Sequence, residues 1–225
     1  MNKRRVFLIP VIALLLAFCA VQIGCKSKKS DDSFTDERDG NTYKTVKIGE
    51  QIWMAENLKY LPSVDAPTTG SYTEPHYYVY DYEGNNVEEA KATDTYKTYG
   101  VLYNWKAALS ACPEGWHLPT NSEWEQLIEF LGGETVAGGK LKSTDSIYWN
   151  IPNEGATNES GFNALPGGYR EYSGVFSYLN SYGFWYSATE YSSDYAWNRY
   201  LDSNNSNAFK YYSKENGFSV RCIKD

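Results

Sequence analysis

Residues 104–133 constrain the fold more than any other part of the chain. Asn104 can cap a helix, because its side chain can accept hydrogen bonds from the free backbone N–H groups of a first turn. Apolar residues then recur at positions i, i+3, i+4 and i+7: Trp105, Ala108, Leu109 and Cys112. This spacing puts them on one helical face, and Pro113 cannot continue the helix. The pattern predicts a short amphipathic helix that ends before Pro113.

A second helix is predicted directly after the first. Thr120 and Glu123 have the spacing of a capping box, in which the hydroxyl and the carboxylate each accept from a free backbone N–H. The expected buried stripe consists of Trp124, Leu127, Ile128 and Leu131. Gly132-Gly133 can adopt the left-handed conformation that ends a helix.

Residues 1–24 have the layout of a secretory signal. Basic residues at positions 3–5 precede an apolar run over 6–21, which is short for a membrane span. The end of this run resembles the cleavage box of bacterial lipoproteins, with Cys25 as the lipidated residue. Residues 25–33 are polar and are expected to form a tether. We therefore expect a lipid-anchored protein of the cell envelope, in the outer membrane and exposed at the surface. The alternatives are an uncleaved anchor and ordinary secretion.

Charge and cysteine content narrow the partners and the compartment. Without the basic residues at positions 3–5, 18 basic residues oppose 28 acidic ones, a net charge of −10. Such a charge argues against a nucleic-acid partner, because binding to phosphates requires basic residues. Cys19 is removed with the signal and Cys25 carries lipid, which leaves Cys112 and Cys222. In an oxidising compartment this pair is expected to form a disulfide.

The predicted domain, residues 34–225, reads mainly as strands and loops. A small meander is expected over 34–54, with turns at Asp39-Gly40 and Gly49-Glu50. A calcium-loop interpretation of Asp36, Asp39 and Asn41 lacks the EF-hand spacing, so a turn is favoured. Further strands are expected at 76–82, 184–188, 195–201 and 217–222. The polar segment 84–98 is predicted to be a surface excursion.

Six segments carry a resemblance to a known family: GNTYKTVKIGEQIWMAENL, YGVLYNWKAAL, CPEGWHLPTNSEWEQL, ESGFNALPGGYR, FWYSATE and GFSVRCIKD. Together they resemble the Fibrobacter succinogenes major paralogous domain over nearly the whole mature chain. The resemblance implies an α+β, C-type-lectin-like domain related to formylglycine-generating enzymes. It implies two short helices, curved antiparallel strands, long loops and termini that lie close together. It also implies a disulfide from the first helix to the last strand, in agreement with the cysteine count.

Two activities of such relatives were tested against the residues. A calcium-dependent lectin would need oxygen ligands, but Ile151-Pro152-Asn153-Glu154 lacks the leading carboxylate and Trp197-Asn198-Arg199 carries a cation instead. Formylglycine generation would need reactive thiols, and the available cysteines occupy disulfide positions. His76 and His117 are far apart and are interpreted as structural. We therefore expect no metal, no cofactor and no catalytic residue.

Residues 186–216 have an unusual composition. Of 31 residues, six are Tyr, six Ser, five Asn and two Asp, a mixture that antibody paratopes also use. Before the GFSVRC ending, such a segment also resembles regions diversified by retroelements on lectin-like folds. The predicted ligand-binding face consists of Tyr186, Tyr191, Tyr195, Asn198, Tyr200, Asn204, Asn205, Tyr211 and Tyr212. The expected function is non-enzymatic binding of a protein or glycan at the cell surface, with the membrane contacted through the lipid. The alternatives are a structural envelope protein and an enzyme related to formylglycine-generating enzymes.

Overall fold

The computed structural model describes residues 33–225. The predicted signal peptide, the predicted lipidation site at Cys25 and the predicted tether up to residue 32 lie outside the described residues. Ser33, the last residue assigned to the tether, is the first residue of a strand. No helix within residues 33–225 is long and apolar enough to cross a membrane.

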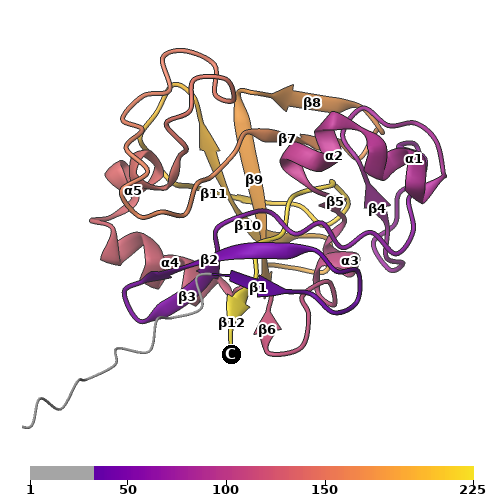
Figure 1. Ribbon diagram of the computed structural model, residues 1–225, viewed down its shortest axis with the longest axis horizontal. Coiled ribbons are helices and arrows are strands. Elements are labelled where there is room, and N and C mark those ends of the chain that lie inside the picture. The colour runs from indigo at the N-terminus through magenta and orange to yellow at the C-terminus, as the bar shows by residue number, and fades with distance from the viewer. Residues whose placement is uncertain (1–32) are drawn as a thin grey trace, which may run out of the picture. The chain divides into compact units, whose positions relative to one another are not determined.

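The described chain is an α+β domain, and its first sheet holds both ends of the described chain (Figure 1). In spatial order the strands are β1 (Ser33–Thr35), β2 (Thr42–Ile48), β3 (Gln51–Met54), β12 (Ile223–Lys224) and β6 (Trp116–His117), all antiparallel. Gly40 and Gly49 have φ of 75° and 61° and form the turns between the first three strands. The predicted meander and its two turns are confirmed.

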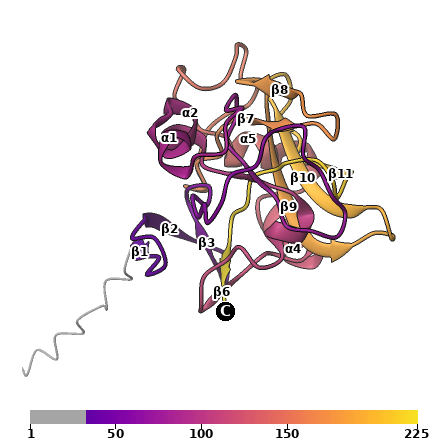
Figure 2. The same cartoon turned by 90° about the vertical axis from the view of Figure 1, so that its right-hand side faces the viewer.

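A second sheet positions the candidate site. Its order is β11 (Phe209–Tyr212), β10 (Ala196–Asp202), β9 (Tyr182–Glu190), β7 (Gly167–Arg170) and β8 (Phe176–Leu179). The neighbours are antiparallel except β7 and β9, which are parallel. Figure 2 shows β9, β10 and β11 on one side of the domain, with α1 and α2 on the other. The predicted strand 184–188 lies within β9, and the predicted strand 195–201 lies within β10 except at Tyr195, which precedes it.

Two predicted strands differ from the structure. The strand expected at 76–82 is reduced to β4 (Tyr77–Tyr78), which pairs with β5 (Leu102–Tyr103). Residues 217–222 form no continuous strand. They are joined to the rest of the domain by isolated bridges of Gly217, Phe218 and Ser219 to three separate segments. This stretch therefore acts as a connector between the sheets.

Both predicted helices are present, as α3 (Trp105–Ala108) and α4 (Asn121–Phe130). Asn104 caps α3, and the Thr120–Glu123 capping box of α4 is complete. The predicted face of α3 is wrong at Leu109, which is 42% exposed. The helix ends after four residues and continues in turns with i→i+3 hydrogen bonds, which rotate the following side chains relative to an α-helix.

Three further helices were not predicted: α1 (Val87–Ala92), α2 (Asp94–Tyr99) and α5 (Glu134–Leu141). The first two replace the expected surface excursion. Their N-termini are capped by Asn86 and Thr93, and Tyr96 is buried. Helix α5 contains Gly138 and Gly139, residues that disfavour a helix. A Cβ at either position would lie 2.1–2.2 Å from a backbone oxygen of another loop, so the glycines permit close packing.

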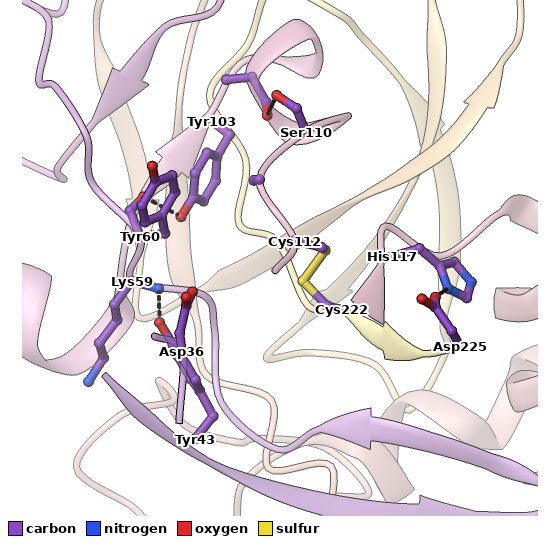
Figure 3. Close-up of a disulfide and its surroundings, with 12 residues drawn as sticks. Asp36, Tyr43, Lys59, Tyr60, Tyr103, Ser110, Cys112, His117, Cys222 and Asp225 are labelled. Atoms are coloured by element: carbon purple, nitrogen blue, oxygen red, sulfur yellow. Dashed lines mark hydrogen bonds and ion pairs between the residues drawn. A yellow bond between two sulfur atoms is a disulfide. The ribbon is translucent and has the colours of Figure 1, made fainter. Parts of the chain in front are cut away.

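Two apolar clusters fill the domain. One joins α4 and α5 to the second sheet through aromatic residues that include Trp53, Trp124 and Trp185. The other surrounds the disulfide between Cys112 and Cys222, which connects the segment after α3 to the residue before β12 (Figure 3). The predicted disulfide is confirmed.

Two buried cations hold the long loops in place. The Lys142 ammonium donates to the backbone oxygens of Glu154, Asp202 and Asn205 at 2.7–2.9 Å. Burial lowers the pKa of Lys142 to about 8. Arg170, at the end of β7, donates to backbone oxygens of the loop 67–69 and of residue 215. Both side chains satisfy carbonyl groups that loops would otherwise leave unpaired.

Candidate functional site

The second sheet has one face packed on helices and one face rich in aromatic residues. Side chains alternate along a strand, so Trp185 and Leu201 point toward the cluster formed by α4 and α5. Tyr182, Phe184 and Tyr200 point to the opposite face, because Phe184 and Tyr200 are directly paired between β9 and β10. The strand pattern thus builds an aromatic surface on this second face.

On this face the sheet forms a groove of about 220 Å³. Its lining, here called the aromatic groove, consists of Tyr169, Tyr178, Tyr182, Phe184, Tyr200, Tyr211 and Phe218. These residues come from five strands and from the connector before β12. Tyr178 and Tyr211 form its exposed rim, at 54% and 45% exposure, while Phe184 and Phe218 are buried at its base.

Five rings of the groove fall into two orientations. The plane of Phe184 lies within 15° of the planes of Tyr182 and Phe218. Tyr169 and Tyr178 form a second stacked pair, with planes 7° apart. The two sets meet at steep angles, 60° between Tyr169 and Phe184 and 68° between Tyr178 and Tyr182. The groove is therefore bounded by ring walls that face it from different directions.

The charges next to the groove are negative. The Tyr169 hydroxyl donates to a Glu171 carboxylate oxygen at 3.3 Å. Burial raises the pKa of Tyr169, and the Glu171 charge raises that pKa further. Burial also raises the pKa values of Tyr182 and Tyr200, and there the second contribution is the Asp202 carboxylate. None of the seven lining residues carries a basic group.

Two residues of the predicted binding face are buried, and their assignment is corrected. Tyr186 is fully buried and donates its hydroxyl to the Asn216 backbone oxygen at 2.8 Å. The ring of Phe218, 4.9 Å away, packs over it. Asn198 is paired with Tyr186 and is 1% exposed; its amide atoms have no hydrogen-bond partner among the described residues. Neither side chain can reach a ligand in this conformation, because the connector covers this part of the sheet.

The other predicted residues fall into four places. Tyr200 and Tyr211 line the aromatic groove. Tyr191 and Tyr195 are exposed where the chain turns between β9 and β10. Asn204 and Asn205 lie in the loop between β10 and β11, at the other end of β10, and Tyr212 ends β11. The predicted residues therefore do not form one continuous face.

Five groove residues were missed: Tyr169, Tyr178, Tyr182, Phe184 and Phe218. The alternation Tyr182-Phe184-Tyr186 was the available signal, since residues at i, i+2 and i+4 share one face of a strand. Tyr178 gave no such signal, because no strand was predicted over residues 176–179, where β8 lies. Its φ of 61° is rare for this residue type.

The histidines are held by carboxylates. His117 bonds Asp225 through Nδ1 at 2.6 Å and Glu123 through Nε2 at 2.8 Å. Burial opposes protonation, but these two bonds raise the pKa of His117 above its ordinary value. His76 lies 3.3 Å from Asp65. Within residues 33–225, no group of three or more His, Cys, Asp or Glu side chains is arranged to hold a metal ion.

A second hollow, of about 260 Å³, is more polar and is lined in part by Arg221, Lys59 and Lys97. Each nitrogen of the Arg221 guanidinium makes a structural contact: Nε donates to the Asn57 side chain, and the two terminal nitrogens donate to the backbone oxygens of residues 162 and 163. Burial lowers the pKa of Arg221 to about 9. This arginine anchors the connector to its surroundings, which leaves the aromatic groove as the better candidate.

The model of the Fibrobacter succinogenes major domain matches residues 46–224. No curated protein and no solved structure shows a significant match. Because the matched region covers most of the chain, the protein belongs to the Fibrobacter succinogenes major domain family.

Proposed function

We propose that this protein is a non-enzymatic, lipid-anchored protein of the cell envelope that binds a protein or glycan ligand through the aromatic groove. The groove is the observation that carries the proposal. Seven aromatic side chains from distant segments converge on one hollow. We also propose that the α+β domain has a C-type-lectin-like arrangement, a fold that holds ligands on loops and strand faces.

The groove keeps aromatic surface in contact with water. Each Å² of apolar surface left in contact with water forgoes about 25 cal/mol of stabilisation. Concave hollows lined by aromatic side chains with a few polar groups are the usual form of a ligand site. Tyrosine rings add stiff contact area at low entropic cost, and their hydroxyl groups can bond a polar ligand.

The test compares rim residues with an exposed tyrosine outside the groove. Tyr178→Ala and Tyr211→Ala should each weaken ligand capture at least about fivefold, because anchor residues cost more than about 1 kcal/mol when truncated. Tyr172→Ala is the matched control, since Tyr172 is 70% exposed and does not line the groove. The purified protein and its variants would be compared on glycan arrays and on panels of labelled envelope proteins, with thermal melts alongside. Equal capture by all variants would support the structural, site-free alternative.

The location has a separate test. Cells that are fed a labelled fatty acid should label the wild type but not Cys25→Ser. Surface proteolysis of intact cells would then test the proposed exposure at the outer membrane. Equal labelling of both proteins would refute the lipid anchor and leave the groove proposal untouched.

Diversification by a retroelement is the second part of the proposal, and it concerns exposed positions only. Tyr191, Tyr195, Asn204 and Tyr211 are exposed and can change without disturbing the core. Variation at Tyr186 and Asn198 would disturb buried packing. A reverse transcriptase beside a near-copy of the segment for residues 186–216 would support this part. Its absence from the genomic neighbourhood would refute it.

A further inference from the structure

The lining of the aromatic groove favours one charge of ligand. Aromatic rings present a negative face, and cations within about 6 Å of a ring centroid are attracted to it. Here the lining is entirely aromatic, and the nearby charges that act on its tyrosines are those of Glu171 and Asp202. An anionic ligand would be repelled both by the ring faces and by the carboxylates of Glu171 and Asp202.

The ring arrangement favours a rounded group over a flat one. A single stacked platform would suit a planar ligand, but two ring walls meet here at 60–68°. The rings of the two walls touch edge to face, with centroids 5.0 Å apart for Tyr169 and Phe184 and 4.9 Å apart for Tyr178 and Tyr182. A group that lies in the corner formed by these walls would contact aromatic surfaces from two directions. The volume of about 220 Å³ is below the roughly 300–1,000 Å³ of sites for drug-sized molecules. The groove therefore suits a compact head group.

We propose that the group bound in the aromatic groove is a quaternary ammonium, such as the trimethylammonium of choline. This proposal rests on the proposed function, in which the aromatic groove is the ligand-binding site. Aromatic cages recognise such cations through ring faces alone. A primary ammonium is strongly hydrated and needs acceptors for three N–H donors. A methylated cation needs no hydrogen-bond acceptors, so an aromatic lining serves it best.

Glu171 is the carboxylate that is available to complement this charge. Its oxygens accept from the hydroxyls of Tyr169, Ser173 and Ser177, and within residues 33–225 it forms no ion pair. Asp202 differs, because Lys142 donates to its backbone oxygen and balances part of its charge. The negative charge at Glu171 thus lies at the hydroxyl edge of the Tyr169 ring, without an ion pair to a described cation.

The test uses choline and its neutral isostere 3,3-dimethylbutan-1-ol, titrated into the purified protein by calorimetry. Choline should bind on the order of tenfold more tightly, because only the cation gains the ring attraction. Tyr178→Leu keeps an apolar rim but removes a ring and should reduce this preference, while Tyr178→Phe should retain it. Tyr172→Leu is the control outside the groove, and Glu171→Gln should weaken choline but not the isostere.

Equal binding of choline and the isostere would overturn the proposal, as would an unchanged preference in Tyr178→Leu. These failures are distinguishable from failure of the proposed function. If Tyr178→Ala still weakens capture of a protein or glycan, the groove is a binding site for another chemistry. If neither choline nor any captured ligand depends on Tyr178 or Tyr211, the groove is not the binding site.

Discussion

Removing the Cys112–Cys222 disulfide should cost a large part of the folding free energy. The bond closes a loop of 110 residues. Cross-linking a chain lowers the entropy of its unfolded ensemble, and for a loop of this length the chain-entropy relation gives about 4.8 kcal/mol at 25 °C. A typical domain is stable by only about 5–15 kcal/mol. The variant should therefore remain folded at low temperature with a small margin.

The variant is Cys112→Ala with Cys222→Ala. Alanine is chosen because Cys222 is fully buried among apolar side chains, where a serine hydroxyl would lack a partner. For a domain of 150–250 residues, each kcal/mol corresponds to about 2–4 °C in Tm. The expected decrease in Tm is therefore about 10–20 °C.

Thermal melts followed by circular dichroism would measure this decrease with and without a reducing agent. Reduction should lower the Tm of the wild type to that of the double variant and should leave the double variant unchanged. A difference below about 3 °C between the two oxidised proteins would refute the reasoning. So would a non-reducing peptide map that recovers both cysteines as free thiols.

Three further changes test the packing, the site assignment and the carboxylate contacts of His117. Gly139→Ala should destabilise the protein by about 1–3 kcal/mol, because the new Cβ would clash with the Gly155 oxygen. Helix propensity alone would instead stabilise the protein by about 1 kcal/mol. The sign of the change in unfolding free energy, measured by urea unfolding, decides between these two effects. Tyr186→Phe should cost about 1 kcal/mol and leave ligand capture unchanged; weaker capture with a normal melt would contradict its burial. His117→Gln should reduce the unfolding free energy most below about pH 6.5, where His117 is protonated and paired with its two carboxylates. The difference from the wild type should disappear as the pH rises through the raised pKa of His117 in the folded state. Equal losses of unfolding free energy at pH 6 and pH 9 would contradict the two carboxylate contacts.

The sequence predicted those helices and turns that are determined by interactions between residues close together in the chain. The capping box at Thr120 and the apolar stripe after it predicted α4 because both act within a few turns of helix. Helix α5 could not be predicted in this way. Gly138 and Gly139 argue against a helix locally, and their reason lies in oxygens of residues 207 and 155 that only tertiary packing brings near.

In the candidate site, too, local sequence signals identified only some of the residues, and tertiary structure determines the rest. Composition singled out residues 186–216, and two of the nine selected residues do line the groove. Amino-acid composition does not show which side chains are buried, so Tyr186 was assigned to the binding face although the Phe218 ring packs against it. Tyr169 and Tyr178 lie earlier in the chain and enter the groove only because β7 and β8 pair beside β9. No spacing rule links such positions before the sheet order is known.

The packing around the aromatic groove holds its rings in place before a ligand binds. Phe184 and Phe218 at its base belong to the cluster that contains Cys222, and Arg170 fixes the end of β7 to two loops. Trp185, the neighbour of Phe184, is locked into the opposite cluster with α4. A ligand would therefore meet rings that are already ordered, which lowers the entropic cost of association. The exposed tyrosines between β9 and β10 lie outside this supported region, so substitutions there can alter the surroundings of the groove while its walls stay in place.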